Sequence, residues 1–316
     1  MRSHDENLAL RQERRSDGRH DIPHHPGAAD LDEAARRFQA LRPRLFGIAY
    51  RVVGTVAEAE DVVQDVWIKW HGYDRSIVEN PDAFLVTMTT RTAINVLNSA
   101  RVRRESYIGP WLPEPIDTEA NPELEAEHNE SLSFALLVVM ESLSPAERAA
   151  FVLREAFGYE YGVIAGILQT SEVATRKLVS RARERVTSGR RRSVPLTQHH
   201  RMLRAFVAAA RSGDVAQLER LLADDVISYS DGGDIVHAAR IAIVGRERVV
   251  KFVAAFSRWF WAGIEVREIE VNGEPAIAVV AGGEPVTILS MVASHDGIER
   301  LYWLLNPQKL ERIAAA

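Results

Sequence analysis

Hydrophobic positions in the first hundred residues recur with the period of an α-helix. Apolar side chains over residues 31–52 fall three or four apart, and Gly54 ends this pattern. A capping box at 55–58 opens a second helix, and Asn80-Pro81-Asp82 opens a third that ends in a cluster of arginines. The pattern therefore predicts an all-helical domain over residues 31–108.

A second helical pattern predicts a helix-turn-helix over residues 132–189. Ser144 to Glu147 form a capping box with proline at the first helical position, and Gly158 ends that helix. After a short helix, the turn at 169–171 precedes a third helix whose outer positions are mostly basic. Because basic residues outnumber acidic ones so strongly there, the pattern favours DNA binding over a merely solvated surface.

Two segments interrupt these domains. Prolines exclude a helix at the start of residues 109–131, and acidic residues follow with no lysine or arginine among them. Because like charges repel, this composition predicts an extended linker that spans a distance. A second linker is expected at residues 190–197, after a run of arginines.

The last segment, residues 198–316, changes from helical to strand-like periodicity. Helices are expected at 198–211, 214–222 and 245–261, and a strand begins at Val226. Four strand-like runs, separated by glycine-containing turns, are then expected at 264–271, 276–281, 286–294 and 298–305. Helices followed by a meander predict an α+β domain with a curved antiparallel sheet.

Composition excludes several kinds of site and several classes of protein. The 316 residues carry a formal net charge of −5 and contain no cysteine, which excludes disulfides and cysteine-ligated zinc and fits a cytoplasmic protein. No apolar run is long enough to span a membrane, so no membrane association is expected. The histidine pairs at 24–25 and 199–200 have no partner ligands nearby, and neither a metal nor a cofactor is expected. Residues 1–30 have the composition of a disordered tail.

The helical part, residues 31–188, resembles the extracytoplasmic-function (ECF) sigma factors of bacterial RNA polymerase. The resemblance rests on AEAEDVVQDVWIKW at 57–70, NPDAFLVTMTTRTAINVLNSARVRR at 80–104, LSPAERAAFVLREAFGYEYGVIA at 143–165 and TRKLVSRARERV at 175–186. It implies core RNA polymerase and promoter DNA as partners, promoter-specific transcription initiation as the function, and a monomer in the free state.

The C-terminal part resembles the cone-shaped α+β fold of the SnoaL and NTF2 type. ECF sigma factors of the SigJ-type subgroup carry such an extension together with a WLPEP linker motif, which stands here at 111–115. Two further motifs of that subgroup correspond to Asp231-Gly232-Gly233-Asp234 and to Asn306-Pro307-Gln308-Lys309-Leu310. Asp234 replaces the last glycine, and Ile235 stands where a lysine is expected.

The resemblance also implies which residues meet each partner. The polymerase would contact the acidic-polar face of the second helix, formed by Glu58, Glu60, Asp61, Gln64 and Asp65. Promoter melting would use Asn80, Asn95, Asn98, Arg101, Arg103 and Arg104. The recognition helix would place Glu172, Thr175, Arg176 and Val179 toward the major groove and Lys177, Arg181 and Arg183 at phosphates, with Ser171 as its cap.

We expect the C-terminal domain to regulate rather than catalyse, so no catalytic residue is predicted. The residues expected to carry regulation are Trp111, Leu112, Pro113, Asp231, Gly232, Gly233, Asn306, Pro307, Lys309 and Leu310. Two alternatives stay open: a small-molecule isomerase or hydrolase fused to a DNA-binding module, and a helix-turn-helix repressor that needs no polymerase. A buried pair of Asp231 with His237 or His295 would favour the enzyme. Whether the domain binds a small ligand is also open.

Overall fold

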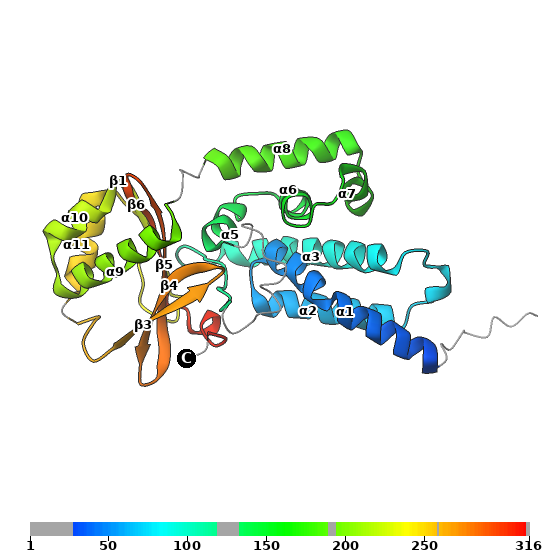
Figure 1. The fold of residues 1–316 in the computed structure, drawn as a ribbon, viewed down its shortest axis with the longest axis horizontal. Helices are drawn as coiled ribbons and strands as arrows, with labels where there is room; N and C mark the ends of the chain where they lie inside the picture. The colour runs from blue at the N-terminus through cyan, green and yellow to red at the C-terminus, as the bar shows by residue number, and fades with distance from the viewer. Residues whose placement is uncertain (1–27, 119–132, 189–193, 258, 314–316) are drawn as a thin grey trace, which may run out of the picture.

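The computed structural model describes residues 28–118, 133–188, 194–257 and 259–313. The molecule is elongated, with three helices at one end, the sheet domain at the other, and the helix-turn-helix alongside the first (Figure 1). The expected disordered tail at 1–30 and the acidic part of the linker beyond 118 lie almost wholly outside the described residues.

The first domain consists of α1 (Ala28–Val53), α2 (Val56–His71) and α3 (Pro81–Glu105), with a 3₁₀ turn at Arg75–Ile77. The caps form as the sequence predicts: Thr55 accepts a hydrogen bond from the Glu58 amide, and Asn80 accepts one from the Ala83 amide. The apolar stripes of the three helices meet in one core that continues into the next domain.

The helix-turn-helix consists of α5 (Phe134–Met140), α6 (Pro145–Phe151), α7 (Tyr161–Leu168) and α8 (Glu172–Ser188), and α6 continues into a π-helical turn at Val152–Ala156. The capping box of Ser144 and Glu147 is present. Gln169 adopts a left-handed conformation, with a φ of 53°, in the turn before α8. The predicted helices and turn of this domain are therefore confirmed.

The C-terminal domain is α+β, as expected. Three helices, α9 (Leu196–Ser212), α10 (Val215–Leu221) and α11 (Arg246–Phe256), pack with strands β1 (Leu222–Asp231), β2 (Ile243–Val244), β3 (Glu265–Val271), β4 (Glu274–Ala281), β5 (Glu284–Ser294) and β6 (Gly297–Leu304). A 3₁₀ turn, η5 (Pro307–Lys309), follows β6. The expected helix at 245–261 ends earlier, at Phe256.

The sheet order is β2-β1-β6-β5-β4-β3, and the sheet is mixed. The expectation of an antiparallel sheet is wrong for one pair, because β1 and β6 run parallel. The chain leaves β1, passes through α11 and the β3–β5 meander, and returns beside β1 in the same direction. Only such a long crossover can join parallel neighbours, whereas local turns reveal the antiparallel ones.

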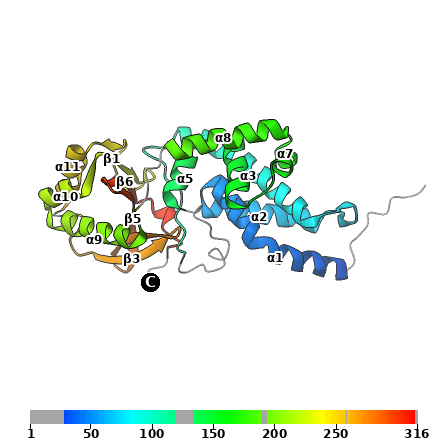
Figure 2. The same ribbon diagram turned by 45° about the horizontal axis from the view of Figure 1, so that its top comes forward.

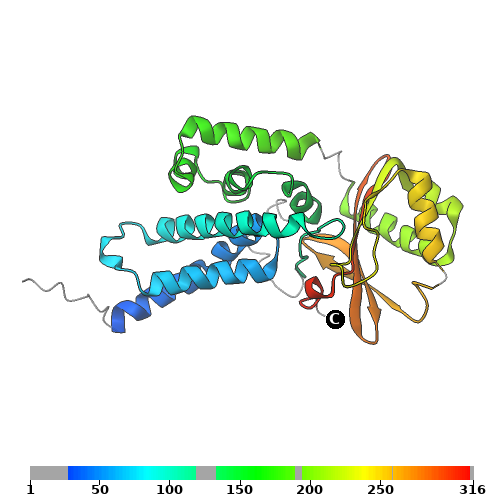
Figure 3. The ribbon, with the colours of Figure 1, turned by 180° about the vertical axis from the view of Figure 1, so that it is seen from behind.

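The two faces of the sheet pack against different parts of the chain. Helices α9 to α11 cover one face with a core of their own. The other face lies against the linker, α5 and the C-terminal segment, in a cluster that includes Leu112, Phe134, Tyr302, Leu310 and Ile313. Figure 2 shows α5 between the sheet and the other helices, and Figure 3 shows the C-terminal segment beside the first domain. No helix among the described residues is long and apolar enough to cross a membrane.

Candidate functional site

The linker segment 111–118 lies in a buried seam between the first domain and the C-terminal domain. Leu112 and Glu114 are 1% and 4% exposed. The Leu112 amide donates to an Asp231 carboxylate oxygen at 2.8 Å, and the Glu114 amide donates to the Gly54 carbonyl at 2.9 Å. The linker is therefore tied to both domains within three residues.

A buried charge cluster holds the linker on the C-terminal side. We call it the Lys309 cluster, and it comprises Tyr107, Trp111, Asp231, Asn306 and Lys309. The Lys309 ammonium lies 2.7 Å from Asp231 Oδ2, donates to the Leu112 carbonyl and sits 4.2 Å from the centre of the Trp111 ring. Tyr107 donates its hydroxyl proton to Asp231 Oδ1, and Asn306 Nδ2 donates to the Tyr107 oxygen at 3.1 Å.

Burial makes this pairing obligatory. Asp231 is 1% exposed and Lys309 is 7% exposed, so each charge is stabilised by the other in place of water. Desolvation lowers the pKa of the Lys309 ammonium, and the Asp231 carboxylate opposes that shift. Burial, followed by the hydrogen bond to Asp231, raises the pKa of Tyr107. Removal of either charge would leave the other buried without its partner.

The two C-terminal motifs meet in this cluster. Gly233 has a φ of +65°, and a Cβ there would lie 2.4 Å from Asn306 Nδ2, so this position tolerates no side chain. Asn306 in turn caps η5 by accepting from the Gln308 amide. Asp234, which replaces a glycine of the resembling motif, also has a positive φ, of 58°. Aspartate tolerates this conformation better than most residues.

Asn272, in the Asn272-Gly273 turn between β3 and β4, is a second anchor for the linker. Its amide donates to the Ile116 carbonyl at 2.9 Å, its Oδ1 accepts from the Ile116 amide at 3.1 Å, and its Nδ2 donates to the Tyr50 hydroxyl at 2.9 Å. Asp117 pairs with Val271 in an antiparallel bridge, so the linker adds to the β3 edge. An Asn-Gly pair is common in hairpin turns, so the sequence gives no sign that this asparagine also binds the linker.

Asn272→Gly should loosen this anchor while preserving the turn, because glycine keeps the left-handed backbone. The Ile116 amide and the Tyr50 hydroxyl would lose buried partners, which costs about 1–3 kcal/mol each. We expect faster hydrogen exchange at residues 116–118, measured by mass spectrometry. Tyr50→Phe removes only the hydroxyl and should give a smaller increase. Unchanged exchange in Asn272→Gly would show that the sheet edge holds the linker without this side chain.

Glu114 connects the linker to α2. Its Oε2 accepts from the Val56 amide at 2.8 Å, at the N-terminus of α2, where the helix dipole favours a negative charge. The Tyr50 hydroxyl donates to the Glu114 carbonyl at 2.7 Å. Burial raises the pKa of the Glu114 carboxyl, and the bond from Val56 opposes the shift.

The predicted polymerase-facing residues fall into two groups. Asp61, Gln64 and Asp65 are exposed on α2. Glu58 pairs with Arg103 at 2.7 Å and lies 3.5 Å from Arg104. Glu60 pairs at 2.8 Å with Arg312 of the C-terminal segment. The C-terminal segment therefore occupies one edge of this face.

Two of the predicted promoter-melting arginines are not free for DNA. Arg101 donates to the carbonyls of Glu141 and Leu143, between α5 and α6. Arg104 binds Glu141 at 2.6 Å, and its guanidinium lies 3.4 Å from the centre of the Trp111 ring. In this arrangement packing between the domains engages both cations, and their role as DNA contacts stays a prediction.

The other residues of this set lie at the surface. Asn95 and Asn98 are exposed on α3, Arg103 is exposed beside Glu58, and Asn80 caps the helix. Arg91, which the sequence reasoning missed, donates to the carbonyls of Gly166 and Ile167 at the end of α7. It adds another contact between α3 and the helix-turn-helix.

On the recognition helix, the structure confirms the cap and corrects the buried stripe. Ser171 Oγ accepts from the Ala174 amide. Thr175 and Val179 are both 0% exposed, and Thr175 donates to the Ser171 carbonyl, so neither can reach a DNA groove. The side chains that face the core are Thr175, Val179, Ala182 and Val186. Of the residues predicted to contact DNA on this helix, Glu172, Arg176, Lys177, Arg181 and Arg183 are exposed.

Comparisons with known proteins identify the two helical domains. Residues 37–103 match Sigma-70 region 2, and residues 133–186 match Sigma-70, region 4. The chain is 37% identical over 232 residues to the ECF RNA polymerase sigma factor SigJ of Mycobacterium tuberculosis, covering 72% of this chain and 74% of that protein. The chain belongs to the ECF sigma factor family. It directs transcription initiation, and sigma factors bind core RNA polymerase and promoter DNA.

Other relatives extend the likeness beyond the helical regions. The crystal structure of SigJ from Mycobacterium tuberculosis superimposes with a TM-score of 0.71 at 32% identity, over 88% of this chain and 98% of that one. A probable ECF sigma factor SigI of the same species is 27% identical, over 90% of this chain and 97% of that protein. The C-terminal domain of this sigma factor is therefore part of the shared architecture.

The family assignment resolves both alternatives. A repressor independent of polymerase does not explain a match to region 2, and this sigma factor is not an enzyme. The catalytic alternative required a buried Asp–His pair. Asp231 is buried, but it accepts hydrogen bonds from Lys309, Tyr107, the Leu112 amide and the Gly233 amide. Its carboxylate is thus engaged by these four donors, one of which is the linker amide of Leu112.

Proposed function

We propose that the C-terminal domain regulates this sigma factor by holding regions 2 and 4 and their linker in a closed arrangement. The observation that carries the proposal is the Lys309 cluster, in which a C-terminal lysine binds the linker carbonyl and a buried aspartate together. Core polymerase must break these contacts if region 4 is to move away from region 2. The C-terminal segment thus competes with the polymerase.

The closed arrangement also occupies the surfaces needed for initiation. Arg101 and Arg104 are engaged with region 4, and Glu60 is engaged with Arg312. We propose that opening releases these side chains to promoter DNA and polymerase. Asp61, Gln64 and Asp65 would provide the first polymerase contact, because they are exposed before opening.

The body of the C-terminal domain would have a second, supporting role. Helix α5 reads FALLVVM and is apolar all round, so it needs partners on both sides. Leu136, Leu137 and Met140 belong to the helical core, whereas Phe134, with Ala135 and Val138, packs in the cluster formed with the sheet. Loss of the whole domain would expose that second side of region 4.

In vitro transcription with core polymerase tests this division of roles. Truncation before Asn306 removes the lysine and Arg312 but keeps the sheet, and it should raise transcription. Truncation after Arg192 removes the covering sheet as well, and it should lower transcription. If both truncated proteins transcribe like the intact protein, the C-terminal domain has no regulatory role.

We further propose that Arg176 reads bases and Arg181 holds phosphate. Both are exposed on α8, and Arg176 pairs with Glu172 at 2.5 Å near the start of the helix, where recognition helices contact base edges. Arg176→Ala should reduce the binding free energy for the cognate site by about 1–3 kcal/mol and relax the sequence specificity. Arg181→Ala should weaken binding to all DNA sequences alike. It should also reduce by about one the slope of log K against log salt concentration. Binding titrations at several salt concentrations, on cognate and scrambled DNA, measure both. Identical behaviour of the two variants would refute the assignment.

A further inference from the structure

A pocket lies where the loop after β1 meets the end of α3. Its volume is about 270 Å³, and its lining comes from residues 230–240 and from Ile108 of region 2. Sites of this size lie just below the range of about 300–1,000 Å³ usual for ligand pockets, so only a small molecule fits. Ile108 is the lining residue that comes from region 2, so the lining is complete only while region 2 lies against this loop.

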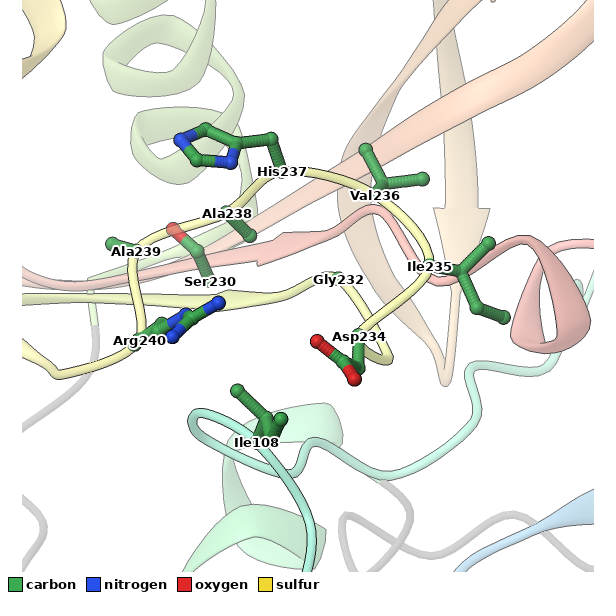
Figure 4. A pocket seen from close by; sticks show the side chains of 10 residues that line it. All are labelled: Ile108, Ser230, Gly232, Asp234, Ile235, Val236, His237, Ala238, Ala239 and Arg240. Atoms are coloured by element: carbon green, nitrogen blue, oxygen red, sulfur yellow. The ribbon is translucent and has the colours of Figure 1, made fainter.

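Opposite charges face this pocket. Figure 4 shows the Asp234 carboxylate and the Arg240 guanidinium pointing into it from the two ends of the loop, with Ile108 beside them. Within the described part of the chain, neither side chain has an ion pair or hydrogen bond, and the two do not pair with each other. The remaining lining combines the apolar side chains of Val236, Ala238 and Ala239 with the polar side chains of Ser230 and His237.

Both charged side chains are exposed, and backbone contacts position the residues that carry them. Asp234 has a φ of 58°, and the amides of Ile235 and Val236 both donate to the Gly232 carbonyl, which closes the loop into a tight turn. At the other end, a Cβ on Gly109 would lie 3.6 Å from the Arg240 Cα, so the start of the linker runs directly beside Arg240. The backbone positions of Asp234 and Arg240 are therefore set by the loop and by the adjacent linker.

From this geometry we propose that the pocket binds a small zwitterion, an α-amino acid with a small apolar side chain. Its carboxylate would meet the Arg240 guanidinium, its ammonium would meet the Asp234 carboxylate, and its side chain would contact Ile108 and the alanines. A molecule with only one charge would leave one protein charge unmatched.

The consequence rests on the proposed regulatory function. A ligand that contacts both the loop and Ile108 stabilises the closed arrangement, and by linkage it weakens whatever requires opening. Asp231, three residues before Asp234, holds the linker through the Lys309 cluster, so pocket and cluster share one loop. Occupation of the pocket would therefore reduce the affinity for core polymerase.

Calorimetry on the full chain with L-valine as the probe tests the site. Isobutylamine and isovalerate carry the same apolar group with only the ammonium or only the carboxylate. We expect saturable binding of L-valine and at least about tenfold weaker binding of both controls. Arg240→Gln and Asp234→Asn should each abolish the difference, whereas Arg248→Gln, an exposed arginine on α11, should not.

In vitro transcription with the same probe tests the coupling. L-valine should lower transcription by the intact protein and not by Arg240→Gln. No L-valine binding, or equal binding of isovalerate, would overturn the proposal even if the tail truncation raises transcription as proposed. Binding of L-valine that leaves both core affinity and transcription unchanged would overturn the coupling. If neither truncation alters transcription, the regulatory function fails, while the calorimetry still decides the site.

Discussion

Lys309→Ala is expected to raise transcription above that of the intact protein and to open the molecule in solution. The substitution leaves Asp231, which is 1% exposed, without the cation that faces it, and breaking a buried pair in this way costs about 3–5 kcal/mol. The cost falls on the closed arrangement, because an open linker exposes Asp231 to water. Core polymerase then has less interaction energy to overcome. Small-angle scattering should show a larger radius of gyration, and in vitro transcription should show higher activity.

A matched variant separates this effect from a general loss of charge. Lys251→Ala removes a lysine from the same domain, but its pair with Glu247 is exposed on both sides and should contribute little. The double variant Asp231→Asn with Lys309→Met removes both charges together. It should recover part of the closed population, because no unpaired buried charge remains. A Lys309→Ala protein that scatters and transcribes like Lys251→Ala would show that the cluster does not hold the closed form.

Reversing Asp61 and Asp65 to lysine should weaken binding to core polymerase about tenfold or more, mainly through a slower, salt-dependent association. Both carboxylates are exposed on α2, while the buried residues of that helix, including Val62, Val63 and Val66, are unchanged. The fold of region 2 should therefore persist. Circular dichroism checks the fold, and association kinetics at low and high salt measure the effect.

The control for this pair carries the same change in net charge elsewhere. Glu219→Lys with Glu284→Lys replaces two exposed acids of the C-terminal domain. If the control slows association as much as the α2 variant, long-range charge rather than a docking face governs the encounter. Unchanged affinity in the Asp61 and Asp65 variant would remove α2 as the docking helix.

Local chemistry accounts for the elements that the sequence predicts well. The capping box at 144–147 forms with both expected bonds, and at 55–58 the Thr55 side chain caps α2, because a helix start depends mainly on neighbouring side chains and amides. Strands β3 to β6 begin and end within two residues of the predictions, since glycine turns separate them. The motifs at 111–115, 231–234 and 306–310 support the regulatory hypothesis, but the sequence does not show which of their residues contact one another.

The tertiary structure decided which polar residues are free and which are engaged. Arg101 and Arg104 sit on a helix that the sequence assigns to DNA, yet carbonyls and carboxylates of region 4 satisfy them. Which side of α8 is buried depends on the helices that pack against it. The sequence pattern alone therefore does not show that Thr175 and Val179 face the core.

Contacts between segments far apart in the chain could not be predicted from the sequence either. The parallel contact of β1 with β6 and the bonds of Asn272 to Ile116 and Tyr50 join segments far apart along the chain, so no local pattern records them. The sequence by itself determined the sigma regions, their caps and the α+β extension, because those depend on local periodicity and turns. Only the folded chain decided that a buried Lys309–Asp231 pair holds the linker against the C-terminal domain, because burial of a charge requires a partner that folding alone supplies.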